Sequence, residues 1–194
     1  MSHPEEYGRL VQLSLEGSRE AFSALYEATI QDVYKTVHYL TEEKTDVDDI
    51  VQEIYIQVHK SLKRYDASKP FRPWLTGLAI RQIHAYRKKR WMRLRIGIKA
   101  LNYTSEKEED FSSQIVEKIS NRSLLAAVNQ LPFKQKQAVV LHYLNEYSQE
   151  EIAEILDIPV GTVKSRIHAA LQKLRQRYER RMLIPGKVEE FHGS

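Results

Sequence analysis

The sequence predicts an all-α protein built from two small helical domains joined by a flexible linker. The 194 residues include only 7 glycines and 6 prolines, and long stretches contain neither. Apolar residues recur at intervals of three and four, and no stretch alternates as a strand would. A charged, Ser/Thr-containing run at 102–110 separates two groups of helices. We therefore expect domains at 1–101 and 120–181, a linker at 102–119 and a tail at 182–194.

The composition argues against several classes of protein. Cysteine is absent, which excludes disulfides, thiol catalysis and cysteine-rich zinc sites and fits a reducing cytoplasm. No signal peptide and no membrane-length apolar run is visible. The seven histidines show no metal-binding spacing, and the GxxxxGK, GxGxxG and GxSxG motifs are missing. We expect no catalytic residue, metal, cofactor or small-molecule substrate, and hence no enzyme.

The N-terminal domain begins with three predicted helices. The first covers 7–15 and ends at Gly17-Ser18, the second covers 21–40, and the third starts between Thr45 and Asp48 and runs to Lys63. One face of the second helix carries its apolar residues together with a threonine. These are Phe22, Leu25, Tyr26, Thr29, Val33, Val37 and Leu40.

The third helix carries an unusual group of acidic and amide side chains. Acids near a helix N-terminus are favoured by the helix dipole, which accounts for Asp46 and Asp48. It does not account for Asp49, Gln52 and Glu53, which share one exposed side. That side is either an acidic docking surface or an ordinary solvated one.

A loop at 64–71 leads into a fourth helix with a strongly basic character. We expect this helix to start at Pro73 and to bury a stripe that includes Trp74. No Asp or Glu occurs between Asp66 and Glu106, an interval rich in Lys and Arg. Such a block fits nucleic acid, with a solvated surface or an acidic protein partner as alternatives. Tyr65 and the neighbouring Phe71 could stack on unpaired bases.

The C-terminal domain is predicted to have four helices, at 123–131 and 132–144 followed by a helix-turn-helix at 148–175. Ser148 and Glu151 form a capping box, and Pro159 and Gly161 mark the turn. The second helix of the motif is expected to start at Thr162. Its buried stripe is Val163, Ile167, Ala170 or Leu171, and Leu174. Its opposite side is short or cationic, which suits a DNA major groove; the alternative is a helical hairpin with a solvated face.

Three motifs in fixed order identify a family resemblance. D-D-I-V-Q-E spans 48–53, F-R-P-W-L-T-G-L-A-I spans 71–80, and S-Q-E-E-I-A and G-T-V-K-S-R lie within 148–166. Together they resemble bacterial RNA polymerase sigma factors of the sigma-70 superfamily. The two-domain form resembles the extracytoplasmic-function (ECF) group, and the resemblance covers about 21–177.

The resemblance implies a role for each surface. The N-terminal domain would be sigma region 2 and would dock on the clamp helices of core RNA polymerase. It would also recognise the −10 element and melt it, with one base of the non-template strand flipped into a pocket. The C-terminal domain would be sigma region 4 and would recognise the −35 element as duplex DNA. The implied docking residues are Asp49, Gln52 and Glu53. The implied −10 residues are Tyr65, Arg72, Arg81, Arg87, Lys88 and Arg90. The implied −35 residues are Thr162, Lys164, Ser165, Arg166 and Ala169.

One position departs from the family pattern. Many ECF members carry asparagine where this chain has Arg81, and a guanidinium cannot accept a hydrogen bond as an amide can.

The resemblance further implies promoter DNA, core polymerase and an anti-sigma factor as partners, in the bacterial cytoplasm, where an anti-sigma factor could hold the chain at the membrane. The alternative function is that of a stand-alone helix-turn-helix transcriptional regulator.

Overall fold

The computed structural model describes residues 4–98 and 124–182, and these two ranges contain helices and turns but no strand. The helices of the first range, the first module, are α1 (Pro4–Leu15), α2 (Arg19–Leu40), α3 (Val47–Ser61) and α4 (Phe71–Ile98), with short 3₁₀ turns η1 (Lys44–Asp46) and η2 (Leu62–Arg64). The second range, the second module, contains helical residues 124–129, then α6 (Phe133–Val139), the π-helical η3 (Val140–Leu144), α7 (Gln149–Leu156) and α8 (Val160–Met182). The all-α prediction is confirmed, while the predicted linker and nearly all of the predicted tail lie outside the described residues.

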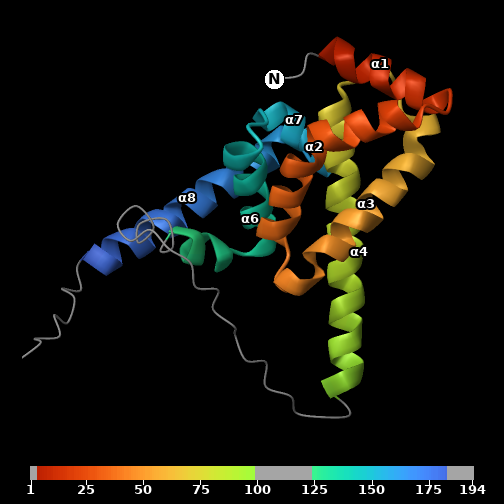
Figure 1. The fold of residues 1–194 in the computed structure, drawn as a ribbon. Helices are drawn as coiled ribbons and strands as arrows, with labels where there is room; N and C mark the ends of the chain where they lie inside the picture. The colour runs from red at the N-terminus through yellow and green to blue at the C-terminus, as the bar shows by residue number, and fades with distance from the viewer. Residues whose placement is uncertain (1–3, 99–123, 183–194) are drawn as a thin grey trace, which may run out of the picture.

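The first module packs α2, α3 and α4 around an apolar core. Ser18 caps α2 by accepting a hydrogen bond from the backbone N–H of Ala21 at 3.1 Å, so the residue expected only to end the preceding helix also starts the next one. Val37, Ile54 and Ile83, one from each helix, are all completely buried. The C-terminal half of α4 extends beyond the other helices of the module (Figure 1).

Two helix starts in the first module differ from the prediction. Helix α4 begins at Phe71, so Pro73 lies inside the first turn, where its missing N–H costs no intrahelical hydrogen bond. Helix α3 begins at Val47 after the η1 turn, and Thr45 lies within that turn instead of capping the helix. Both shifts are small, because a 3₁₀ turn can lead directly into a regular helix and a proline fits within the first helical turn.

The second module confirms the helix-turn-helix geometry. Ser148 and Glu151 exchange the two hydrogen bonds of a capping box, at 3.1 and 2.8 Å. Asp157 ends α7 in the left-handed conformation at φ 51°, and α8 then starts at Val160, two residues earlier than expected. Ala170 is the buried alternative and Leu171 is 41 % exposed. The predicted helix at 132–144 is continuous from Phe133 to Leu144, and its last five residues have π-helical geometry.

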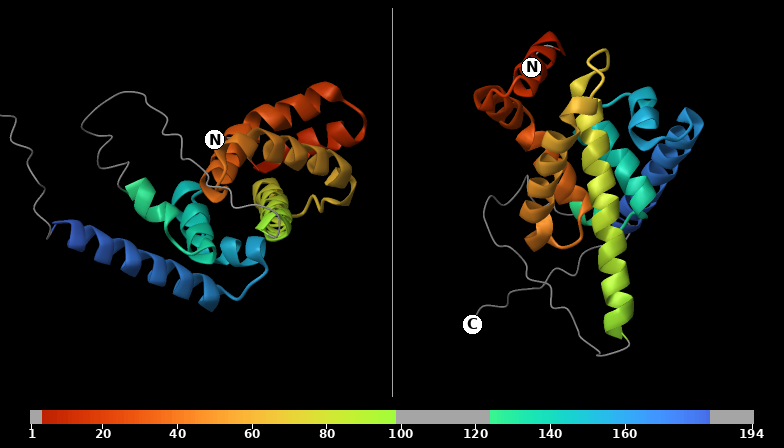
Figure 2. Two further views of the ribbon diagram at one scale, coloured as in Figure 1. Left: turned by 90° about the horizontal axis from the view of Figure 1, so that it is seen from below. Right: turned by 90° about the vertical axis from the view of Figure 1, so that its right-hand side faces the viewer.

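The two modules pack directly against each other. Helix α7 lies on α4, and α6 and η3 lie on α2 (Figure 2). Their buried residues form one continuous cluster, in which Leu40 and Ile83 of the first module join Leu141 and Ile152 of the second. The chain therefore has a shared core in addition to the core of each module.

Candidate nucleic-acid and protein-docking surfaces

The acidic and amide residues of α3 form an exposed ridge. Asp49, Gln52 and Glu53 are all solvent-exposed, as predicted, and Ile56 continues the same side one turn later. Glu53 accepts a hydrogen bond from Gln57 at 2.7 Å, which orients its carboxylate along the ridge. The structure thus brings together the three residues expected to dock a partner.

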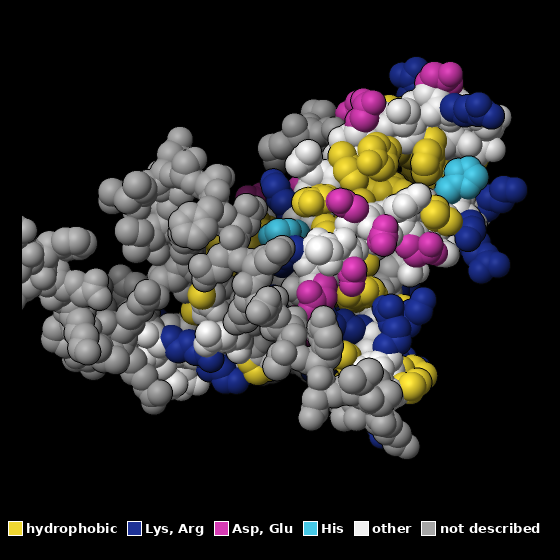
Figure 3. All heavy atoms as spheres, turned by 60° about the horizontal axis from the view of Figure 1, so that its bottom comes forward, with side chains coloured by type: hydrophobic (Ala, Val, Ile, Leu, Met, Phe, Trp, Pro, Cys, Tyr) yellow, Lys and Arg dark blue, Asp and Glu magenta, His cyan; other side chains and the backbone are white. Residues whose placement is uncertain are grey.

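An apolar groove borders this ridge on the side of α2. It has a volume of about 640 Å³ and combines apolar walls with a polar rim. The walls are Phe22, Tyr26, Ile30, Tyr34, Val51, Tyr55 and Ile56, and the rim is Asp48, Gln52, His59 and Lys60. Figure 3 shows this face, with a hydrophobic area next to acidic side chains and a histidine. A groove of this shape between two helices suits an amphipathic helix.

Sequence reasoning did not find the α2 wall of the groove. Tyr26 was expected in the core because it shares the apolar stripe of α2, yet it is 40 % exposed, as is Tyr34. The sequence does contain a pattern that could have predicted this wall. Tyr26 and Tyr34 lie eight residues apart, so they follow each other at about two helical turns along the same edge of the apolar stripe. Tyrosine is common at such edges because its ring is apolar while its hydroxyl stays hydrated.

The predicted −10 residues lie at or near the start of α4 and along it, and they differ in how free they are. Arg81 and Lys88 are exposed and lie seven residues apart on one side of α4. Arg72 pairs with Asp32 of α2. Arg90 pairs with Glu43, at 2.5 Å. The arginines of this helix are therefore divided between an open side and intramolecular ion pairs.

Arg87 is the most constrained of the predicted −10 cations. Its guanidinium lies 2.6 Å from a carboxylate oxygen of Glu42 and 4.0 Å from the ring centre of Phe133 in the second module. One turn earlier, His84 contacts the Gln137 amide at 3.1 Å. Burial and the nearby Arg87 charge lower the pKa of His84 below its ordinary value. This part of α4 thus contacts the second module, while His84 stays solvent-exposed and Arg87 partly so.

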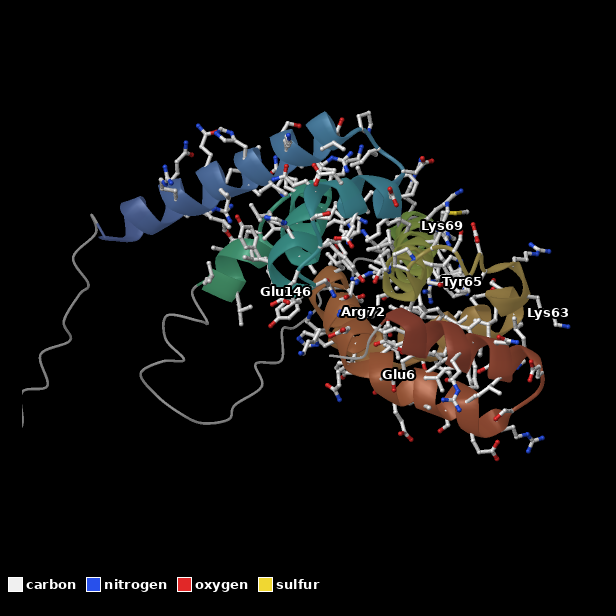
Figure 4. All side chains as sticks on the ribbon, turned by 90° about the horizontal axis from the view of Figure 1, so that it is seen from above. Glu6, Lys63, Tyr65, Lys69, Arg72 and Glu146 are labelled. Carbon is white, nitrogen blue, oxygen red and sulfur yellow. The ribbon has the colours of Figure 1, made fainter. Side chains whose placement is uncertain are left out.

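The loop before α4 has its own internal order. Tyr65 is half-buried, packs edge-on against Phe71 and donates a hydrogen bond to the carbonyl oxygen of Lys69. Asp66 accepts two hydrogen bonds from Ser68, which lowers the pKa of its carboxyl. Figure 4 shows Tyr65 and Lys69 in the loop and Arg72 nearer α2.

The expectation that Phe71 could stack on unpaired bases is wrong. Phe71 is only 3 % exposed and stacks on Tyr7 of α1, with ring centres 5.6 Å apart. The loop is short, so the first turn of α4 turns this ring inward onto α1. Tyr65 is the aromatic side chain of the loop that keeps a solvent-facing part.

The second helix of the helix-turn-helix presents a polar face to solvent. Lys164 and Ser165 are exposed, while Thr162, Arg166 and Ala169 are half-buried at the edges of the same face. Ser165 donates a hydrogen bond to the carbonyl oxygen of Thr162 at 3.0 Å, so its hydroxyl lies close to the helix surface. The five predicted −35 residues therefore lie within the first three turns of α8. Thr162, Ser165, Arg166 and Ala169 share one side of the helix, whereas Lys164 lies on an adjacent exposed side.

The described residues offer little for metal or membrane chemistry. Within 4–98 and 124–182, no group of three or more histidine, aspartate or glutamate side chains is arranged to hold a metal ion. In the same ranges no helix combines the length and the apolar character needed to cross a bilayer. The chemistry visible here is that of charged and apolar contact surfaces.

Family models match both modules. The model described as sigma-70 region 2 matches residues 25–93, and the one described as sigma-70, region 4 matches residues 121–174. The ECF RNA polymerase sigma factor SigW of Bacillus subtilis (strain 168) is 28 % identical over 169 residues, which are 83 % of this chain and 90 % of SigW.

Two solved structures share the fold. The structure of CnrH in complex with the cytosolic domain of CnrY matches with a TM-score of 0.66 and 22 % identity, over 90 % of this chain and 97 % of CnrH. The sigma factor RpoE of Bartonella quintana, in complex with the anti-sigma factor NepR, matches with a TM-score of 0.67 and 17 % identity, over 81 % of this chain and 96 % of RpoE.

Proposed function

Because the chain belongs to the ECF group of the sigma-70 family, we propose that it binds core RNA polymerase and directs promoter-specific initiation of transcription. The observation that supports this proposal is the presence, in one chain, of an acidic ridge beside an apolar groove and of two separate cationic surfaces. The chain would act as a non-catalytic specificity subunit in the cytoplasm.

The docking step would use the ridge and the groove together. A polymerase helix with an apolar side would enter the groove between α2 and α3. Its cationic side chains would pair with Asp49 and Glu53, and its amide side chains would form hydrogen bonds with Gln52. Charge complementarity of this kind speeds association and fixes the register of two helices, and the apolar contact area supplies affinity.

The DNA steps would be divided between the modules. Thr162, Lys164, Ser165, Arg166 and Ala169 of α8 would contact the −35 element, where small side chains permit a close approach to base edges. Near and along α4, Tyr65 and Arg81 would receive the flipped −10 base, and the cations Arg72, Arg87, Lys88 and Arg90 would hold phosphates. Melting costs a few kcal/mol per unstacked step, which captured bases and phosphate contacts would offset.

A regulatory partner follows from the same reasoning. RpoE, which shares this fold, is crystallised with an anti-sigma factor. We propose that an anti-sigma factor also binds this chain, and that it competes with polymerase for the apolar groove, since exposed apolar grooves of this size commonly mark protein contacts.

Charge reversal on the ridge tests the proposal. Asp49→Lys with Glu53→Lys should weaken binding to core polymerase at least tenfold and abolish the promoter-specific transcript, because the ridge would then repel the cations of its partner. The matched control is Glu16→Lys with Glu27→Lys, which makes the same charge change on exposed acids of the first module outside the ridge. An unchanged transcript from the ridge variant, with operator-like binding in the absence of polymerase, would favour a stand-alone regulator.

A further inference from the structure

Helix α1 supplies a buried aromatic ring to the loop that precedes α4. Tyr7 of α1 is 6 % exposed, and its ring stacks on the Phe71 ring with the centres 5.6 Å apart and the planes inclined by 26°. The match to sigma-70 region 2 begins at residue 25, so the whole of α1 lies before it. The family match therefore assigns no role to this contact.

The ring contacts continue from α1 to the loop. Phe71 meets the Tyr65 ring edge-on at 5.5 Å and lies 5.6 Å from the Trp74 ring. The rings of Tyr65 and Trp74 are themselves 5.0 Å apart. All these separations fall in the range of favourable aromatic pairs, about 4.5–7 Å. The four rings of Tyr7, Tyr65, Phe71 and Trp74 thus form one aromatic cluster, which links α1 to Tyr65 through Phe71.

Hydrogen bonds within the loop hold the polar end of Tyr65. Its hydroxyl donates to the carbonyl oxygen of Lys69, so the side chain spans the loop. The Asp66 carboxylate accepts hydrogen bonds from the backbone N–H and the hydroxyl of Ser68, at 3.0 and 2.7 Å. Burial, with a smaller contribution from the Asp66 charge, raises the pKa of Tyr65, which keeps its hydroxyl protonated as a donor. Tyr65 is therefore held at its hydroxyl by the loop and along its ring by the aromatic cluster.

The turn between α1 and α2 fixes where Tyr7 lies. Gly17 adopts φ 98°, a conformation that favours glycine, and the Ser18 N–H donates to the carbonyl oxygen of Leu13 at 3.0 Å. The chain therefore reverses sharply, and α1 packs on α2 while it also contacts α4 and η2. Val11, one turn after Tyr7, is 2 % exposed and joins the core of the first module. Local turn chemistry and burial together place the Tyr7 ring against the start of α4.

We propose that α1 is a positioning element for −10 recognition, in which Tyr7 holds Phe71, and through it Tyr65, in the orientation that receives an unpaired base. This inference rests on the proposed function of the chain. Tyr7 and Phe71 are buried, so they act through Tyr65, which keeps the solvent-facing part of the cluster. A ring that is already fixed binds a base more tightly, because its rotamer freedom is lost on folding and not on binding.

Removal of the Tyr7 ring tests the proposal in the holoenzyme. Tyr7→Leu keeps apolar bulk but loses the stacking, and should weaken binding to fork-junction DNA with unpaired −10 bases about three- to tenfold, the range expected for one aromatic pair. Affinity for core polymerase should stay unchanged, and Tyr7→Phe, which keeps the ring, should bind the fork as the wild type does. The matched control is Val11→Ala, which loosens the same helix without removing a ring. Unchanged fork binding by Tyr7→Leu, or an equal loss in Val11→Ala, would overturn the inference.

Fluorescence of Trp74 tests the positioning without polymerase or DNA. Trp91 is 57 % exposed, and Trp91→Phe leaves Trp74 as the single tryptophan of the chain. In that background Tyr7→Leu should raise acrylamide quenching of Trp74 about twofold, because the close packing of the cluster is lost, whereas Val11→Ala should not. Equal quenching with and without the Tyr7 ring would contradict the inference. If instead the wild-type holoenzyme fails to distinguish fork DNA from a scrambled −10 sequence, the proposed function is wrong, and with it the base-receiving role of the cluster.

Discussion

Lys136 is a buried cation among other cations, and its replacement gives a sharp test of the contact between the modules. It lies on α6, is 7 % exposed and faces Lys44, Arg87 and Glu42 of the first module, with His38 also nearby. Burial, with smaller contributions from the Lys44 and Arg87 charges, lowers the pKa of its ammonium from 10.5 to about 8, and Glu42 opposes this shift. The charged form is therefore disfavoured in the folded chain.

The size of the effect follows from the shift. One pKa unit corresponds to about 1.4 kcal/mol, so holding Lys136 charged at pH 7 costs the folded chain on the order of 3 kcal/mol. Methionine keeps most of the volume of the lysine stem and carries no charge. We expect Lys136→Met to raise the free energy of unfolding at pH 7 by about 1–3 kcal/mol.

The same shift fixes the direction of the pH dependence. Between pH 8 and 10.5 the unfolded chain keeps a proton on Lys136 that the folded chain has lost, so the stability of the wild type rises with pH across this interval. Burial also lowers the pKa of His38 and His84, which adds stability as the pH rises toward their ordinary value of 6.5. Both effects favour the folded chain at higher pH.

Urea unfolding followed by circular dichroism at pH 7 and pH 9.5 measures both quantities. Lys136→Met should be more stable than the wild type at pH 7, and the difference should shrink at pH 9.5. The control is Lys134→Met, an exposed lysine of the same helix, which should change neither value by more than about 0.5 kcal/mol. If the wild type and Lys136→Met show the same change between the two pH values, the buried-cation reasoning is refuted.

Three further predictions address the second module. Ser148→Ala removes the capping box and should lower the unfolding free energy by about 1 kcal/mol, whereas Ser148→Asp should keep most of it, as thermal melts would show. Leu141→Ala leaves a cavity at a fully buried site and should lower the free energy of unfolding by about 2–5 kcal/mol. Both tryptophans lie in the first module, so tryptophan fluorescence reports its unfolding; if the modules unfold together, the fluorescence midpoint should shift with the circular dichroism midpoint. Arg166→Ala should reduce discrimination between a matched and a scrambled −35 duplex while binding to core polymerase persists, and unchanged discrimination in gel-shift titrations would contradict its role.

Features set by local chemistry could be predicted from the sequence. The capping box of α7 depends on residues three apart, and the ridge of α3 follows from helical spacing alone, so each is visible in a few consecutive letters. Helix starts were less predictable, because a proline in the first turn or a preceding 3₁₀ turn moves the boundary by two residues without changing the apolar pattern.

Contacts between distant segments could not be predicted in the same way. Thr76 looks like an ordinary polar residue within an apolar stripe, and Tyr147 looks like the end of a turn; only the fold shows that their hydroxyls meet across 71 residues of chain. Arg87 is a similar case, since the sequence shows a cation in a basic helix and not the Glu42 carboxylate and Phe133 ring that surround it. An arginine assigned to phosphate from its charge can thus be occupied within the protein itself. Its availability to DNA then depends on breaking the ion pair with Glu42 and the contact with Phe133, and no local pattern encodes either interaction.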